Sequence, residues 1–154
     1  MAAYANSPKQ FHHALRYAAA IIPWFWLGII VGISVIETPV RFRTPPITRS
    51  GAAMLGVAVF HALAYVELVL FILLGIAAVA LRNRFVIGAV AVLGIIVAAE
   101  HALVVPVLAV RAALLVQGTT LEPSSVHMWA TMLEFSKMLA LGAIGSRTLS
   151  RFCS

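Results

Sequence analysis

The sequence contains few cysteines and few charges, and both shortages exclude classes of protein. Its single cysteine, Cys153, is next to last in the 154-residue chain, so neither a disulfide framework nor a cysteine-based metal motif is expected. Only 10% of the residues are charged, whereas 62% are hydrophobic and the mean hydropathy is +1.02. No soluble domain of this size needs so much apolar surface, and the composition therefore indicates a membrane protein.

Four apolar segments, each long enough to span a bilayer, occupy nearly the whole chain. We expect helices over about 17–39, 51–81, 85–115 and 125–146. The predicted fold is all-α, a four-helix transmembrane bundle at 17–146, preceded by an interfacial arm at 1–16 and followed by a polar, frayed tail at 147–154. No small-residue cleavage site follows the first apolar run, which is therefore expected to be a retained helix.

Several local features refine this prediction. Trp24 and Trp26, near the start of the first helix, suit an aromatic belt at the membrane interface. Gly28 and Gly32 form a GxxxG step, at which another helix can approach closely. Residues 38–50 contain three prolines and three arginines, which predicts a rigid connector outside the bilayer. Pro106 is expected to kink the third helix, because it cannot donate to the carbonyl group of residue 102.

The formal charge of +6 does not indicate a nucleic-acid partner, because the basic residues mostly flank the apolar segments. There, positive charge sets membrane orientation and contacts anionic lipid head groups. Six basic residues lie on the face that carries the arm, the turn at 82–84 and the tail, and four lie on the opposite face. This difference predicts that both termini are cytoplasmic, in an integral protein of a bacterial inner membrane.

The acidic residues are the most informative ones in the chain. There are five, and only Glu122 lies in an evident loop. The others lie inside or at the end of four different apolar segments: Glu37, Glu67, Glu100 and Glu134. Glu100 is followed directly by His101 in a run that is otherwise almost entirely apolar. A carboxylate at bilayer depth is costly, so such residues usually face the interior of a bundle and have a function.

A pattern shared by the second and fourth helices suggests an internal repeat. His61 precedes Glu67, and His127 precedes Glu134, at offsets of 66 and 67 residues. One interpretation is two tandem helix hairpins related by an axis along the membrane normal. Helical rise then places the three central glutamates and His101 near the midplane, and His61 and His127 roughly 10 Å nearer the non-cytoplasmic face, with Glu37.

Histidine and carboxylate side chains from several helices are what a bundle uses to hold a metal ion, and a haem takes axial histidines. We therefore expect an iron, copper or zinc ion, or a haem. The candidate metal ligands are Glu37, His61, Glu67, Glu100, His101, His127 and Glu134, and the three histidines are the candidate cofactor-binding residues. The Glu-x-x-His signature of di-iron bundles is absent, so this prediction depends on residue type and depth.

Two alternatives remain open. Desolvation favours the neutral form of a carboxyl group, so the buried glutamates could exchange protons in a proton-coupled carrier or channel. In a purely structural interpretation Glu134 pairs with Lys137, three residues on, and Glu100 shares a helix stripe with Arg111. The chain could then be an accessory subunit of a larger membrane complex or a homo-oligomer. The sequence does not decide whether the protein is an enzyme.

Six short segments carry a resemblance to a known group of proteins: WLG at 26–28, GISVIETPVRFR at 32–43, VFHALAYVEL at 59–68, PVLAVR at 106–111, SVH at 125–127 and EFSK at 134–137. Over about residues 25–145 the chain resembles small bacterial four-helix membrane proteins without assigned function. More remotely, the layout is similar to the copper-resistance-D-like membrane superfamily, some of whose members are associated with copper or haem. That resemblance implies a metal or haem function, with redox chemistry or metal homeostasis as its setting.

Overall fold

The computed structural model describes residues 8–45, 47–122 and 124–151, without the side chains of Pro8 and Lys9. In this part of the chain all regular secondary structure is helical, and the predicted all-α four-helix fold is confirmed. Cys153, the first seven residues of the predicted arm and the last three of the predicted tail lie outside the described residues.

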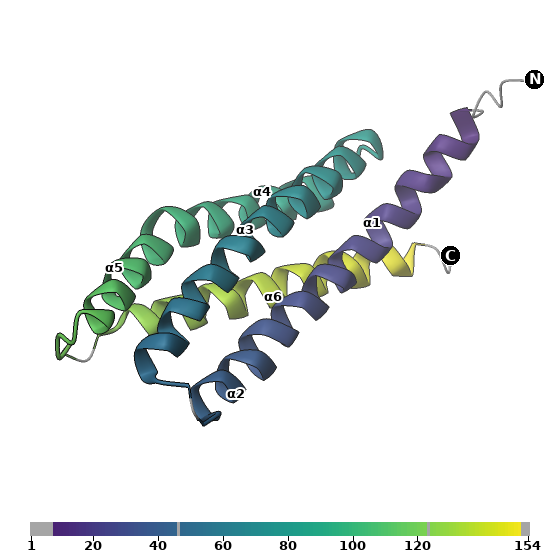
Figure 1. Ribbon diagram of the computed structural model, residues 1–154. Helices are drawn as coiled ribbons and strands as arrows, with labels where there is room; N and C mark the ends of the chain where they lie inside the picture. Colours follow the sequence, from purple (N-terminus) through teal and green to yellow (C-terminus); the bar gives the residue numbers. More distant parts are fainter. Residues whose placement is uncertain (1–7, 46, 123, 152–154) are drawn as a thin grey trace, which may run out of the picture.

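Four continuous helices run side by side along one long axis (Figure 1). The first consists of α1 (Pro8–Ile30), the π-helical segment η1 (Val31–Glu37) and α2 (Thr38–Arg43); the second is α3 (Arg49–Ala80). The third consists of α4 (Arg84–Ala99), the π-helical segment η2 (Glu100–Val104) and α5 (Val105–Val116), and the fourth is α6 (Val126–Ser150). The two chain ends and the α3–α4 turn lie at one end of the bundle, and α2 and the α5–α6 loop at the other.

Three of the four helices are long and apolar enough to cross a membrane. They are Gln10–Arg43, Arg49–Ala80 and Arg84–Val116, with 34, 32 and 33 residues. At 1.5 Å per residue each exceeds the roughly 30 Å of a bilayer's hydrocarbon core. These helices make the chain a membrane protein, and α6 packs along α1 and α4 as the fourth helix.

The first helix is longer than predicted at both ends. It begins at Pro8 instead of Tyr17 and continues through Pro39 to Arg43, so the predicted connector at 38–50 is wrong for its first six residues. The C-terminal extension passes through the π-helical segment η1, in which the amide of Thr38 donates to the carbonyl group of Ile33, five residues back. Pro39 follows at the first turn of α2, where a missing N–H removes no bond that the helix needs.

In the third helix, too, a π-helical segment precedes the proline. The amide of Val105 donates to the carbonyl group of Glu100, again five residues back, and Pro106 then lies in the first turn of α5. The distortion predicted at Pro106 therefore takes the form of the π-helical segment η2 on its N-terminal side. Two residues of the predicted site, Glu37 and Glu100, lie at the end of η1 and the start of η2.

The fourth helix also exceeds its predicted range, because residues 147–150 of the expected frayed tail are helical. The hydroxyl group of Thr148 is buried and donates to the carbonyl groups of Ile144 and Gly145, which allows a polar side chain to pack inside the bundle. At the same end, Nη2 of Arg16 donates to the carbonyl group of Arg151 at 3.2 Å. This contact joins the third turn of α1 to the residue that follows α6.

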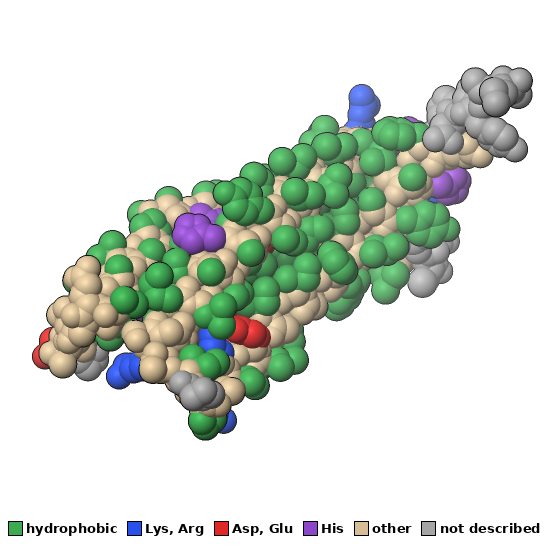
Figure 2. Space-filling view, in the orientation of Figure 1, with side chains coloured by type: hydrophobic (Ala, Val, Ile, Leu, Met, Phe, Trp, Pro, Cys, Tyr) green, Lys and Arg blue, Asp and Glu red, His purple; other side chains and the backbone are tan. Residues whose placement is uncertain are grey.

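The apolar core lies in the half of the bundle nearer the termini. All four helices contribute to it: Trp26, Ile30, Leu70, Leu74, Ala78, Val86, Val90, Leu93, Leu141 and Ile144. Many other large apolar side chains point outward, and on the face shown in Figure 2 they cover the sides of the bundle along most of its length. Helices that are apolar on all sides suit an environment of core on one side and lipid on the other.

Glycine permits close helix contact at positions other than the predicted GxxxG step. A Cβ added at Gly28 or Gly32 would meet no atom within 4 Å, so these two residues do not mark a helix contact within the chain. At Gly94 an added Cβ would lie 2.7 Å from Cζ of Phe71, and at Gly56 it would lie 3.0 Å from Nη2 of Arg41. Gly94 therefore lets the Phe71 side chain of α3 pack closely on α4, and Gly56 lets the Arg41 side chain of α2 pack closely on α3.

Candidate functional site

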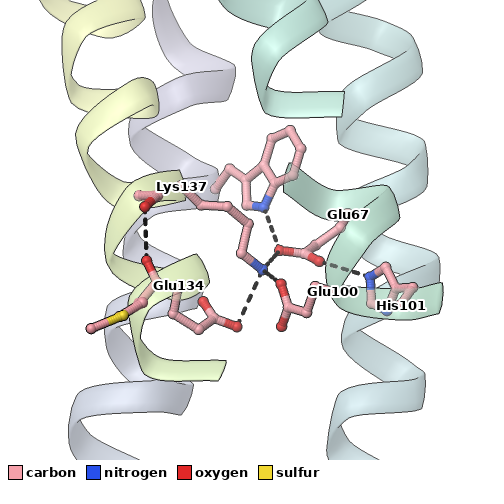
Figure 3. Close-up of polar contacts among 8 residues, drawn as sticks. Glu67, Glu100, His101, Glu134 and Lys137 are labelled. Atoms are coloured by element: carbon pink, nitrogen blue, oxygen red, sulfur yellow. Dashed lines mark hydrogen bonds and ion pairs between the residues drawn. The ribbon is translucent and has the colours of Figure 1, made fainter. Parts of the chain in front are cut away.

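The buried ammonium group of Lys137, on α6, contacts three glutamates. Its Nζ atom lies 2.8 Å from Oε1 of Glu67, 2.6 Å from Oε2 of Glu100 and 3.2 Å from Oε1 of Glu134. The contacts with Glu67 and Glu134 are hydrogen bonds, and the contact with Glu100 is an ion pair. All four side chains are buried, and Figure 3 shows the three carboxyl groups converging on the one nitrogen atom.

Glu67, on α3, accepts hydrogen bonds at both of its carboxylate oxygens. Nε1 of Trp26 donates to Oε1 at 3.1 Å, and Nε2 of His101 lies 3.1 Å from Oε2. Trp26 is fully buried, so the predicted place of this residue in an interfacial belt is wrong, whereas Trp24 is 43% exposed. A buried indole N–H needs an acceptor, and Glu67 provides it. We call Trp26, Glu67, Glu100, His101, Glu134 and Lys137 the central cluster.

Local geometry explains why these side chains meet. Glu134 and Lys137 are three residues apart on α6 and therefore share one face of that helix. Glu100 and His101 open the π-helical segment η2, and their side chains reach different partners, Lys137 and Glu67. With 25% of its side chain exposed, His101 is the member of the cluster that connects Glu67 with the outside of the bundle.

The cluster contains more negative than positive groups. Three carboxylates and one ammonium leave a formal charge of −2 when the imidazole is neutral. Within the described part of the chain, Oε2 of Glu134 is buried without a hydrogen-bond partner, and Oε2 of Glu100 has only the ion pair. Burying uncompensated charge is expensive, and the cluster holds more negative charge than Lys137 alone balances.

The structure brings together four of the seven predicted site residues: Glu67, Glu100, His101 and Glu134. It does not gather the three histidines, because His61 and His127 are exposed. His61 is six residues from Glu67, which turns it about a third of a turn away from that residue's face. His127 precedes Ala130, the first buried residue of α6, and so lies before the packed part of its helix.

Glu37, whose side chain is 36% exposed, belongs to a second polar group, which includes the buried Arg41. It pairs with Arg41 of α2 at 3.4 Å, and Arg41 is only 5% exposed, so this arginine of the predicted connector packs inside the structure. The guanidinium group packs against Gly56 of α3. Among the residues described, Nε of Arg41, Oε2 of Glu37 and the Ser34 hydroxyl are buried without a hydrogen-bond partner.

The described residues contain no group of three or more histidine, cysteine or acidic side chains arranged to hold a metal ion. In the central cluster the ammonium nitrogen of Lys137 occupies the point where the three carboxylates converge. A metal bound by those carboxylates would have to displace it. The metal or haem interpretation of the sequence stays a prediction.

Two important residues of the cluster were not among the predicted site residues. Lys137 was considered only as a local partner of Glu134, and Trp26 only as an interfacial side chain. A signal for Lys137 existed, since it is a cation within an apolar segment while three other segments carry isolated glutamates. Trp26 carried no such signal, because an indole near a helix start is typical of a membrane interface.

Comparison of the chain with protein-family models, with curated proteins and with solved structures finds no match. The resemblance to small four-helix membrane proteins stays a prediction. The functional argument therefore rests on the geometry and charge of the central cluster.

Proposed function

We propose that the central cluster binds and releases protons, and that the chain is a proton-coupled carrier or channel of the membrane. The observation that carries this proposal is the convergence of Glu67, Glu100 and Glu134 on the single buried ammonium group of Lys137. Carboxylic acids at membrane depth are the usual proton-binding groups of pumps and transporters.

The cluster meets two requirements of a proton-exchanging site. First, it needs charge compensation that Lys137 alone does not provide, and protons on the carboxyl groups supply it. Second, a proton needs a group that can relay it to or from a carboxylate, and Nε2 of His101 lies 3.1 Å from Oε2 of Glu67. An imidazole can accept a proton at one nitrogen and release one from the other, which suits such a relay.

A resident metal ion or haem explains these contacts less well. The three carboxylates already have a cation at their centre, and two of the three histidines that a shared ligand set requires are exposed. Neutral imidazole and carboxylate still suit borderline metals, so the metal content of the purified protein belongs in the test.

Infrared spectroscopy of the purified protein in lipid tests proton binding directly. Stepwise alkalinisation should diminish the band of protonated, buried carboxyl groups, and Glu67→Gln, Glu100→Gln or Glu134→Gln should each weaken the pH-dependent signal. Glu122→Gln is the matched control, because Glu122 is exposed outside the helices. If the wild-type spectrum shows no pH-dependent buried carboxyl band, the proton-binding proposal fails.

Proton movement is a separate measurement. In vesicles that contain the protein and a trapped pH-sensitive dye, a potassium diffusion potential should drive proton entry. Glu134→Gln should reduce that entry, and Glu122→Gln should not. A channel conducts under these conditions without further solute, whereas a carrier that needs its cargo shows pH-dependent carboxyl groups with no proton entry. The two outcomes therefore distinguish the two forms of the proposal.

A further inference from the structure

The end of the bundle that carries both termini is basic. The α3–α4 turn and the neighbouring helix ends contribute Arg16, Arg82, Arg84, Arg147 and Arg151. The five glutamates of the sequence all lie elsewhere. At the opposite end, the basic residues of α2 and the α5–α6 region have Glu37 and Glu122 beside them, and Nη2 of Arg111 donates to the carbonyl group of Glu122. The end with the termini therefore carries a group of basic side chains, and the glutamate side chains of the sequence lie elsewhere.

A shallow, widely open groove of about 470 Å³ lies at this basic end, between the start of α4 and the end of α6. Its walls are formed by Phe85 of α4 and by Ala143, Ser146, Arg147 and Ser150 of α6. The four α6 residues recur at helical spacing, so they form one stripe along that helix. The guanidinium carbon of Arg147 lies 5.8 Å from the centre of the Phe85 ring, which positions the charge over the groove's aromatic wall.

The groove changes from apolar to polar along the bundle axis. Ala143 lies one turn deeper in the bundle than Arg147, and Ser150 lies nearer the end of α6. A phospholipid has the same polarity, with acyl chains towards the membrane centre and a phosphate at the interface. Guanidinium groups pair well with phosphate oxygens, and the hydroxyl group of Ser146 adds a further donor.

We propose that this groove binds the phosphate head group of an anionic phospholipid. Arg147 pairs with the phosphate, Ser146 lies beside it, and Phe85 and Ala143 contact the upper part of an acyl chain. The surrounding arginines favour a lipid with net negative charge over a zwitterionic one, since each basic residue near a membrane surface attracts anionic lipid. The proposal is independent of the proton-binding function of the central cluster.

Native mass spectrometry and thermal unfolding of the full chain in detergent test this proposal. Phosphatidylglycerol is the anionic probe, phosphatidylcholine is the zwitterionic comparison, and inorganic phosphate is tested alone. Phosphatidylglycerol should remain bound and raise the melting temperature, and Arg147→Gln should weaken its affinity about fivefold, the effect of one basic residue. Arg147→Lys, which keeps the charge, should recover most of that loss. Arg49→Gln, an exposed arginine at the opposite end, is the matched control.

Three outcomes overturn the proposal. The first is equal affinity for phosphatidylglycerol and phosphatidylcholine. The second is an equal loss from Arg147→Gln and Arg49→Gln, which would indicate general attraction to charged lipid instead of a site. The third is an Arg147-dependent stabilisation by inorganic phosphate as large as that by the lipid, which would assign the groove to a free anion. If Arg147→Gln does not fold, Phe85→Ala serves as the second variant and should weaken lipid binding while keeping every charge.

Discussion

The ammonium nitrogen of Lys137 on α6 lies 2.6 Å from Oε2 of Glu100, the first residue of the π-helical segment η2. The same nitrogen contacts Glu67 on α3, and Glu67 accepts the indole N–H of Trp26 on α1. The central cluster therefore connects all four helices through polar contacts in the middle of an otherwise apolar bundle. This connection has consequences for stability as well as for proton binding.

Replacing the central cation should be strongly destabilising. Lys137→Met keeps most of the side-chain volume but leaves three buried carboxylates without their partner, and losing one member of a buried ion pair costs about 3–5 kcal/mol. Thermal unfolding in detergent measures the loss. Ser136→Ala, at the exposed neighbouring position, is the control and should change stability by less than about 0.5 kcal/mol.

The loss in Lys137→Met should depend on pH in a defined direction. Lowering the pH protonates the carboxyl groups and removes the repulsion that Lys137 otherwise compensates, so the difference in melting temperature from wild type should shrink as the pH falls. It should grow as the pH rises. A difference that is constant between acidic and alkaline buffer would mean that Lys137 acts through packing instead of through its charge.

The two tryptophans of α1 offer a matched pair. Trp26→Phe removes the donor to Glu67 at a fully buried position, and hydrogen bonds to charged groups contribute about 1.5–3 kcal/mol. Trp24→Phe, at a position 43% exposed, should cost less. Equilibrium unfolding of both variants checks the order. Equal losses would show that the Trp26–Glu67 hydrogen bond adds nothing beyond ring burial.

The sequence predicts the number, type and approximate place of the helices, because each apolar segment is long and bounded by arginines, prolines or a polar turn. The limits of the third helix differ from prediction by only one residue at each end. The errors of the sequence prediction are at Pro39, at the start of α1 and at the end of α6, where propensity rules end a helix early. A π-helical segment lets the chain pass a proline without leaving the helix, and no single-residue propensity encodes that.

The candidate site was predicted only in part, and the reason is rotation about the helix axes. Depth follows from counting residues, which placed Glu67, Glu100 and Glu134 in one layer. Which side of a helix faces the bundle depends on a polarity pattern, and in helices apolar on all sides that pattern is weak. His61 and His127 were therefore assigned inward by residue type, and the structure exposes both.

Replacing a glycine of α4 by alanine should disturb the packing of α3 against α4 at Gly94 but not at Gly88. An added Cβ at Gly94 would lie 2.7 Å from Phe71, whereas one at Gly88, on the same helix, would meet no atom within 4 Å. Gly94→Ala should cost about 1–3 kcal/mol by overpacking. Gly88→Ala should raise stability by up to about 1 kcal/mol, because alanine favours the helix. Thermal unfolding in detergent distinguishes them, and a stabilised Gly94→Ala would contradict the observed helix contact.

Orientation in the membrane can be tested by labelling. The charge difference predicts that both termini face the cytoplasm. With Cys153 replaced by serine, a cysteine at Thr119 in the α5–α6 loop should react with an impermeant thiol reagent added to intact cells. A cysteine at Asn83 in the α3–α4 turn should stay protected. The reverse pattern would place the basic end and its groove on the outer face.

The three candidate histidines, His61, His101 and His127, should differ in function, since of these only His101 contacts Glu67. His101→Gln keeps a side chain that can hydrogen-bond Glu67 but does not titrate, so the fold should persist while proton exchange slows. The expected reduction in proton entry into vesicles, or in the rate of the infrared carboxyl response for a carrier, is on the order of a hundredfold or more. His61→Gln and His127→Gln, at exposed positions, should leave both rates unchanged.

Metal analysis of the same variants separates this proposal from a shared histidine site. If His61, His101 and His127 bind one metal ion or haem, replacing any one of them should lower its content in the purified protein, and a chelator should lower the melting temperature of the wild type through linked binding. If only His101→Gln has an effect, and that effect is on proton exchange, the relay to Glu67 is supported. An equal loss of bound metal in all three variants would instead mean that His61 and His127 turn inward in the functional state and that the proton-relay assignment of His101 is wrong.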